Sequence, residues 1–166
     1  MKKAPLMICA VVIVMTSCQP KPATVAVDPE AIKVELSAFM DEYNAAYKTM
    51  DINKMTASCT DNALFLGTDP SEFWDKKQIT DYFMSQGMDT TMKLEFTVDR
   101  REILVAADGK SAIIVEQYFV PAISTKLPVR CIDKVVKVGD KWLFDFISWN
   151  IIARNEDIPK LSAALE

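Results

Sequence analysis

Histidine is absent from this sequence of 166 residues. No imidazole is therefore available as a general base, a proton shuttle or a metal ligand, the roles that histidine often fills near neutral pH. Glycine is scarce as well: the chain has four, and they do not form the glycine-rich loops that bind phosphates. No serine or cysteine stands in a recognisable arrangement with an activating base. These absences exclude several large classes of enzyme.

Basic residues are outnumbered by acidic ones, 19 to 23, and they form no cluster. An acidic surface of this kind argues against nucleic acid and anionic lipid headgroups as partners. Cysteine is sparse too. Cys59 and Cys131 would remain after the processing described below, and we expect two separate buried thiols rather than one disulfide. No spacing typical of a metal site occurs, so we predict neither a metal nor a cofactor.

The first 17 residues have the pattern of a secretory signal peptide. Lys2 and Lys3 precede the apolar stretch 4–16, which is too short to span a bilayer. The ending Met15-Thr16-Ser17-Cys18 resembles a bacterial lipobox, in which the cysteine becomes lipidated. An ordinary cleavage site followed by an incidental cysteine is the alternative. We expect residues 1–17 to be a lipoprotein signal peptide and Cys18 to carry the lipid.

A short tether and one domain would follow this cysteine. Residues 18–28 contain proline and have no helical or strand period, so we expect an extended tether. Residues 29–166 suffice for one domain with a hydrophobic core. We expect a location in the bacterial cell envelope, at the outer membrane facing the periplasm, with membrane contact through the lipid alone. Loss of Lys2 and Lys3 would change the formal net charge from −4 to −6.

Helix signals dominate the first half of the domain. Asp28-Pro29-Glu30 combines a capping carboxylate with proline at the first helical position, and apolar residues then recur at steps of three or four up to Met50. Asp51 would cap a short second helix that ends at Thr60-Asp61-Asn62. Residues 63–67 would form a strand. We expect a long helix, a short helix and a short strand, in that order.

The stretch 67–83 predicts a third helix with clear boundaries. Asp75 and Gln78 have the spacing of a capping box, in which each side chain accepts a hydrogen bond from the other residue's N–H. Trp74, just before the cap, would pack on the first apolar residue of the helix. The apolar face of this helix would consist of Ile79, Tyr82 and Phe83.

Beyond this helix the apolar period changes to two, which is typical of strands. Stretches 93–107 and 110–121 flank Asp108-Gly109, and stretches 127–138 and 141–152 flank Gly139-Asp140. Both dipeptides are strong signals for two-residue hairpins. We therefore expect four long antiparallel strands, followed by a short helix at 158–165 that packs at an edge.

Two-residue turns would also fix the registers of these strands. Arg101 would face Glu116, Lys134 would face Asp145, and Arg130 would face Trp149. The stretch 112–120 is apolar on both faces, whereas an antiparallel sheet usually has one face in water. Helices can cover one face, so we expect a second copy of the chain to cover the other, in a homodimer.

The order of elements and three motifs resemble the SnoaL-like branch of the NTF2-like superfamily. The motifs are the turn Gly67-Thr68-Asp69-Pro70-Ser71-Glu72 with its following helix, the hairpin Gly139-Asp140-Lys141-Trp142, and Phe146-Ile147-Ser148-Trp149-Asn150. The resemblance covers residues 30–152. It implies an α+β cone in which three N-terminal helices pack on a curved antiparallel β-sheet and enclose a pocket, and it implies frequent dimers.

The same resemblance leaves the function open, because members include polyketide cyclases, ketosteroid isomerases, dehydratases, transport factors and binding modules. This chain departs from the family at Asp75, where many members have glycine. It also lacks any counterpart to the histidine of cyclases that use an Asp-His pair.

In such a cone, aromatic side chains and one carboxyl group would line the wall or mouth of a ligand pocket. The residues expected there are Tyr43, Tyr47, Phe65, Trp74, Phe83, Glu116 and Trp149. The alternative is that these side chains simply fill the core. A cavity of roughly 300 Å³ or more would favour ligand binding.

Three residues are candidates for catalysis: Glu116, Asp145 and Tyr47. A buried carboxyl group can act as a general base, and a helix tyrosine can donate to a developing oxyanion, as the resemblance to ketosteroid isomerases implies. Structural ion pairs of Glu116 with Arg101 and of Asp145 with Lys134 are the preferred interpretation. We therefore predict a lipid-anchored module that binds a small, partly apolar or amphipathic molecule. A histidine-free enzyme and a structural, partner-binding subunit are the alternatives.

Overall fold

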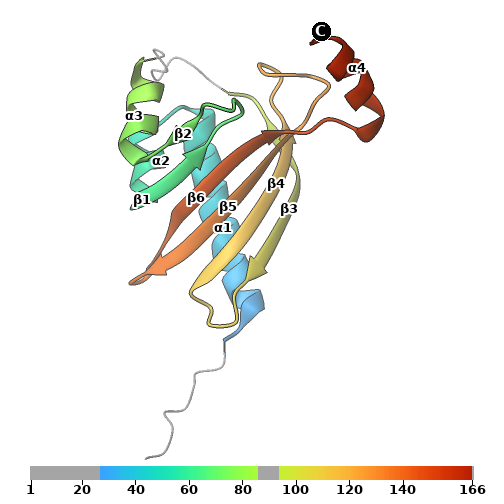
Figure 1. The fold of residues 1–166 in the computed structure, drawn as a ribbon. Coiled ribbons are helices and arrows are strands. Elements are labelled where there is room, and N and C mark those ends of the chain that lie inside the picture. Colours follow the sequence, from blue (N-terminus) through green and yellow to red (C-terminus); the bar gives the residue numbers. More distant parts are fainter. Residues whose placement is uncertain (1–26, 86–93, 166) are drawn as a thin grey trace, which may run out of the picture.

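The computed structural model describes residues 27–85 and 94–165 (Figure 1). The predicted signal peptide, Cys18 and most of the tether lie outside these residues. The helices are α1 (Pro29–Lys48), α2 (Ile52–Ala57), α3 (Lys76–Ser85) and α4 (Ile158–Ala163), with the 3-10 helix η1 (Asn155–Asp157) before α4. The strands are β1 (Cys59–Leu66), β2 (Phe73–Trp74), β3 (Thr97–Val105), β4 (Ser111–Phe119), β5 (Val129–Val138) and β6 (Lys141–Ile151).

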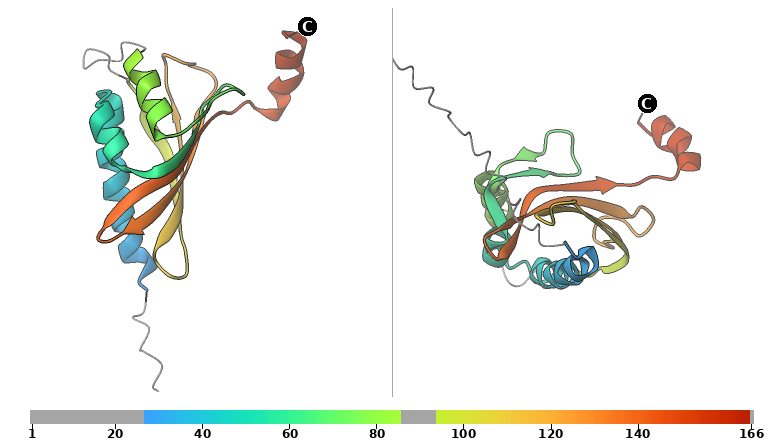
Figure 2. Two further views of the ribbon diagram at one scale, coloured as in Figure 1. Left: turned by 60° about the vertical axis from the view of Figure 1, so that its left-hand side comes forward. Right: turned by 90° about the horizontal axis from the view of Figure 1, so that it is seen from below.

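The strands form one sheet of six in the order β2-β1-β6-β5-β4-β3. β3 to β6 form the expected antiparallel meander, whereas β1 runs parallel to β6. The sheet is thus mixed rather than wholly antiparallel. Parallel neighbours need a long connection, and the chain between β1 and β6 contains a helix and three long strands. The sheet is curved, and α1 lies across its concave face (Figure 2).

Side-chain caps begin the first three helices, as expected. The Asp28 carboxylate accepts hydrogen bonds from the N–H groups of Glu30 and Ala31, and the Asp51 carboxylate accepts one from Lys54. Asp75 and Gln78 form the predicted capping box, with distances of 2.8 and 2.9 Å. Helix starts are predictable here because each cap involves residues at most three positions apart.

β1 begins at Cys59, four residues earlier than the predicted strand. Thr60-Asp61-Asn62, expected only to end the second helix, therefore belongs to this strand, and the predicted strand start at residue 63 is wrong. Pairing with β6 decides this stretch: the Phe144 N–H donates to the Ser58 carbonyl at 2.8 Å, and Cys59 lies opposite Phe144. A long-range ladder thus overrides the local preference of polar residues for turns.

The strand registers agree with the prediction next to both turns, and each hairpin has one irregularity further on, between Val98 and Arg100 and between Lys134 and Val135. Arg101 faces Glu116, as expected. In the second hairpin, however, Lys134 faces Phe146 and Arg130 faces Asn150, because Asp145 is an extra residue between Phe144 and Phe146. The predicted registers of Lys134 and Arg130 are therefore wrong by one residue. The alternation of apolar and polar residues along a strand does not by itself reveal such a β-bulge.

α1 and the concave face of the sheet form the hydrophobic core. Leu36, Met40 and Tyr43 of α1 are buried against the sheet residues Ile114, Val135, Phe144 and Ile147. α4 does not join this core. It has no buried residue and lies apart from the sheet (Figure 1), so the prediction that it packs at an edge is wrong.

Candidate functional site

A pocket of about 250 Å³ lies where α3 and the β1–β2 connection meet the ends of β4, β5 and β6. Six of its side chains are aromatic: Tyr47, Trp74, Tyr82, Phe83, Tyr118 and Trp149. The other described residues that line it are Gly67, Thr68, Glu72, Ile79, Val120, Ile123 and Val129. Aromatic and aliphatic walls with few polar groups are typical of sites for small molecules.

Four residues expected to form the pocket wall do so: Tyr47, Trp74, Phe83 and Trp149. The other three expected residues lie deeper in the fold and do not line the pocket. Tyr43 packs on Phe144 with ring centroids 4.5 Å apart, Phe65 stacks on Trp149 at 6.5 Å, and Glu116 is buried in an ion pair.

The cavity is also smaller than the expected 300 Å³, because aromatic rings fill the inner part of the cone. Phe96 contacts both Tyr47 and Tyr118, with centroid distances of 5.8 and 4.9 Å. The interior is thus partly a packed core.

The start of α3 positions one wall of the pocket. The capping box fixes the backbone at Asp75, and Trp74 just before it stacks on Tyr82, eight residues further on, at 4.8 Å and an interplanar angle of 25°. Ile79 on the same side of α3 is buried and also lines the pocket. The residues that start α3 therefore also position the aromatic side chains of this pocket wall.

Glu72 is a pocket residue that the sequence analysis did not single out. Its Oε2 atom accepts a hydrogen bond from the Asp69 N–H at 2.9 Å, and its carbonyl accepts one from the Gly67 N–H at 3.0 Å. A Cβ atom on Gly67 would lie 1.9 Å from Oε2 and 2.8 Å from the Glu72 Cβ. Glycine at 67 is therefore required for this carboxylate position. The turn motif contained both residues, but only the fold shows that they meet.

Glu116 belongs to a buried polar cluster beneath α1. Its carboxylate accepts hydrogen bonds from Arg101 Nε at 2.5 Å and from Asn44 Nδ2 at 2.9 Å. Arg101 also donates to the Ser37 carbonyl and to Asp41. This is the structural ion pair that the register predicts. Asp145 likewise pairs with Lys134 at 2.7 Å, and it does not line the pocket.

Asp133 is a second buried carboxyl group that the sequence analysis missed. It is 1% exposed, and its Oδ1 atom accepts a hydrogen bond from the Cys131 thiol at 3.0 Å. Burial raises its pKa from 3.8 to about 8. The alternation of Val129, Cys131, Asp133 and Val135 on one face was the available signal. Asp133 does not line the pocket.

Burial keeps Tyr47 and the two cysteines of the domain neutral. Burial raises the pKa of the Tyr47 hydroxyl, which therefore stays protonated and can donate a hydrogen bond. Cys59 and Cys131 are buried, free thiols, as expected, and burial raises the pKa of Cys59 to about 12. In residues 27–85 and 94–165 no group of acidic or cysteine side chains is arranged to hold a metal ion.

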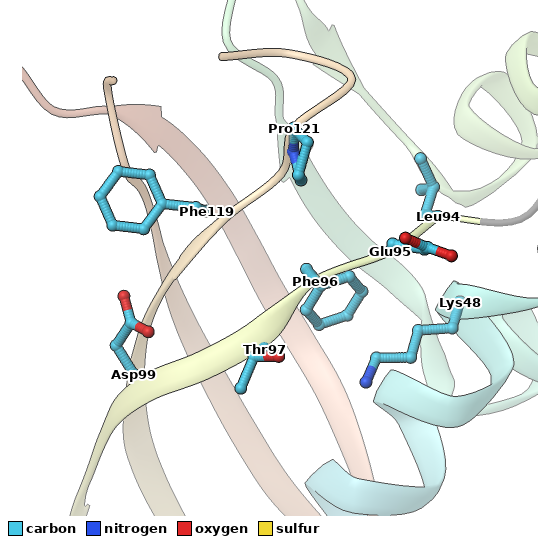
Figure 3. A pocket seen from close by; sticks show the side chains of 8 residues that line it. All are labelled: Lys48, Leu94, Glu95, Phe96, Thr97, Asp99, Phe119 and Pro121. Atoms are coloured by element: carbon cyan, nitrogen blue, oxygen red, sulfur yellow. The ribbon is translucent and has the colours of Figure 1, made fainter. Parts of the chain in front are cut away.

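A larger groove of about 460 Å³ lies at the start of the edge strand β3 (Figure 3). Its side chains come from the end of α1, from β3 with the residues before it, and from the end of β4: Lys48, Leu94, Glu95, Phe96, Thr97, Asp99, Phe119 and Pro121. Lys48 Nζ lies 4.8 Å from the Phe96 ring centroid. The groove mixes charges of both signs, whereas aromatic walls from several elements surround the smaller pocket. The smaller pocket is therefore the better site for a small molecule.

Solved structures with the same fold come from several bacteria. An NTF2-like protein from Pseudomonas putida has a TM-score of 0.62 at 17% identity, covering 76% of this chain and 91% of its own. A cystatin-like fold protein from Burkholderia xenovorans has a TM-score of 0.60 at 17% identity, covering 75% and 94%. A protein from Pectobacterium atrosepticum has a TM-score of 0.62 at 12% identity, covering 80% and 98%. At these identities the likeness shows the fold alone.

No curated protein matches this sequence. The profile of the SnoaL-like domain family, however, matches residues 36–143, which begin within α1 and extend into β6. The aromatic pocket, the α+β architecture and this match agree with one another. The chain belongs to the SnoaL-like domain family, within the NTF2-like fold.

Proposed function

We propose that this domain binds a small, largely apolar molecule in the aromatic pocket. The observation that supports this most directly is the meeting of Tyr47, Trp74, Phe83 and Trp149, from four different elements, around about 250 Å³ of free space. Pockets for drug-sized ligands have volumes of about 300–1,000 Å³. The ligand is therefore a small one.

Native mass spectrometry of the protein purified from the cell envelope tests this proposal. We expect the wild type to retain a small molecule, and Trp74→Ala and Phe83→Ala to lose it. Phe73→Ala is the matched control, because Phe73 is 65% exposed and does not line the pocket. A wild-type spectrum without any retained molecule, together with no saturable binding of small aromatic compounds, would contradict the proposal.

An enzyme that uses Glu116 or Asp145 has less support. Each carboxylate is neutralised by a cation, Arg101 or Lys134, and neither lines the pocket. A general base must reach the proton that it removes, directly or through one water. The isomerase, cyclase or dehydratase alternative therefore lacks a base among these two residues.

We also propose that the domain is held at the outer membrane of a bacterial envelope by a lipid on Cys18 and faces the periplasm. The motif Met15-Thr16-Ser17-Cys18 supports this. Within residues 27–85 and 94–165 no helix is both long enough and apolar enough to cross a membrane. Acyl chains on the first mature residue would provide stable membrane contact.

A homodimer through the outer face of the sheet remains our proposal for its assembly. Ile113, Val115 and Ile132 are adjacent there on β4 and β5, and Ile132 and the neighbouring Leu104 are 37% and 65% exposed. The charged residues on the same face have both signs, so two copies related by a two-fold axis can complement each other. These are Arg100, Glu102, Arg130 and Lys134.

A further inference from the structure

The pocket lining carries charge of one sign, which is negative. Glu72 is the one charged side chain among the described residues that line it, and no lysine or arginine does so in that part of the chain. A bound carboxylate or phosphate would thus meet a negative group with no cation to balance it. An anionic ligand is disfavoured on this ground.

Glu72 also differs from two other carboxylates that are not exposed. Glu116 and Asp145 each pair with a lysine or arginine. In residues 27–85 and 94–165, Glu72 has no such partner within ion-pair distance. Its hydrogen bond from the Asp69 N–H and its contact with Gly67 hold the carboxylate in place at the pocket. A fixed negative charge is therefore available to a ligand.

The aromatic walls favour positive charge as well. The faces of tryptophan and tyrosine rings carry partial negative charge and attract ammonium groups. Trp74 and Tyr82 stack with an interplanar angle of 25°, and Tyr47 and Trp149 stack with an angle of 27°. The formal net charge of −4 would also raise the local concentration of cations.

We propose that the pocket selects a small organic cation, an aliphatic amine or quaternary ammonium compound, over neutral and anionic molecules of the same shape. This inference rests on the proposed function of the pocket and specifies its ligand class. Glu72 would neutralise the charge of the ligand, and the aromatic rings would surround its alkyl groups.

Three probes of nearly equal shape test the inference: choline, 3,3-dimethylbutan-1-ol and 3,3-dimethylbutanoate. Their affinities for the purified protein are measured by isothermal titration calorimetry. We expect choline to bind at least tenfold more tightly than the neutral alcohol, and the anion to bind most weakly. Choline affinity should fall with increasing salt concentration, whereas the affinity of the alcohol should not, since salt screens only the charged interaction.

Glu72→Gln removes the charge and keeps the shape of the side chain. It should lower choline affinity about tenfold and leave the affinity of the alcohol unchanged. Glu42→Gln, at an exposed position on α1, is the matched control and should change neither. Because the salt dependence uses the wild type, the test also holds if Glu72→Gln folds poorly.

The outcomes separate this inference from the proposed function. Equal affinities for choline and the alcohol, or a retained natural molecule without a basic nitrogen, would overturn the selection of cations and leave the pocket as a binding site. If none of the probes binds at millimolar concentration and the native mass spectrum shows no retained molecule, the proposed function fails and this inference with it.

Discussion

Asp133 is a carboxyl group that the folded protein keeps protonated near neutral pH. Its pKa rises from 3.8 to about 8 because burial disfavours the charged form. Between these two values the folded state holds a proton that the unfolded chain has released. The free energy of unfolding should therefore fall as pH rises from about 4 to about 8, and level off above that.

The substitution Asp133→Asn should remove this pH-dependent loss. We expect the variant to gain a few kcal/mol relative to wild type at pH 8 compared with pH 4, since one unit of pKa shift corresponds to about 1.4 kcal/mol. Urea unfolding of both proteins at pH 4 and pH 8 measures the difference. Asp140→Asn, in an exposed turn, is the control. A stability difference between variant and wild type that is the same at both pH values would contradict the assignment.

Residue identity alone did not reveal the roles of Asp133 and Glu72. Both are ordinary acidic residues in the sequence, and their roles depend on neighbours that the fold provides. Asp133 meets the Cys131 thiol in a buried layer, and Glu72 lies over Gly67 beside the pocket. Glu116 was predictable because the hairpin register itself supplies its partner Arg101.

At the level of elements, α3 links local sequence signals to the pocket. Asp75→Ala should remove the hydrogen bond that the Asp75 carboxylate accepts from the Gln78 N–H. Loss of such a cap typically costs about 1 kcal/mol of the free energy of unfolding. We expect this loss in denaturant unfolding, and weaker ligand binding as well, because the cap adjoins Trp74.

Asp81→Ala serves as the control for the cap. Asp81 is exposed on the same helix and forms a surface ion pair with Lys77. Surface ion pairs contribute little, so this variant should remain close to wild type in stability and binding. Equal effects of the two substitutions would show that the capping box has no special part in the stability of α3.

At the level of the whole molecule, we propose that the outer sheet face forms the dimer interface. Ile132→Asp would place a charge at the centre of the proposed dimer interface, beside Val115. We expect a dimer for the wild type and a monomer for the variant in size-exclusion chromatography with light scattering. Val34→Asp is the control, because Val34 is 73% exposed on α1. A monomeric wild type would rule out the dimer.

The proposed membrane attachment through Cys18 also concerns the whole molecule. Cys18→Ala should abolish incorporation of radiolabelled palmitate and release the protein from the membrane fraction. We expect the stability of the folded domain to be unaffected, because Cys18 belongs to the predicted tether. Absence of label in the wild type would leave an ordinary cleavage site as the remaining interpretation of this motif.

The sequence by itself determined the order of the main elements, the helix caps, the register next to the first hairpin turn and the family. These features depend on residues close together in the chain, such as Asp75 with Gln78, or on a turn that sets the pairs around it. Such short-range interactions leave patterns that can be found without knowing the fold.

Only the tertiary structure decided the parallel pairing of β1 with β6, the bulge at Asp145 and the size of the pocket. Each depends on packing between residues far apart in sequence. Tyr43 and Tyr47 lie on the same helix, yet Tyr43 fills the core against Phe144 while Tyr47 lines the pocket. Their chemistry is the same, and the curvature of the sheet above them determines which of the two leaves space for a ligand.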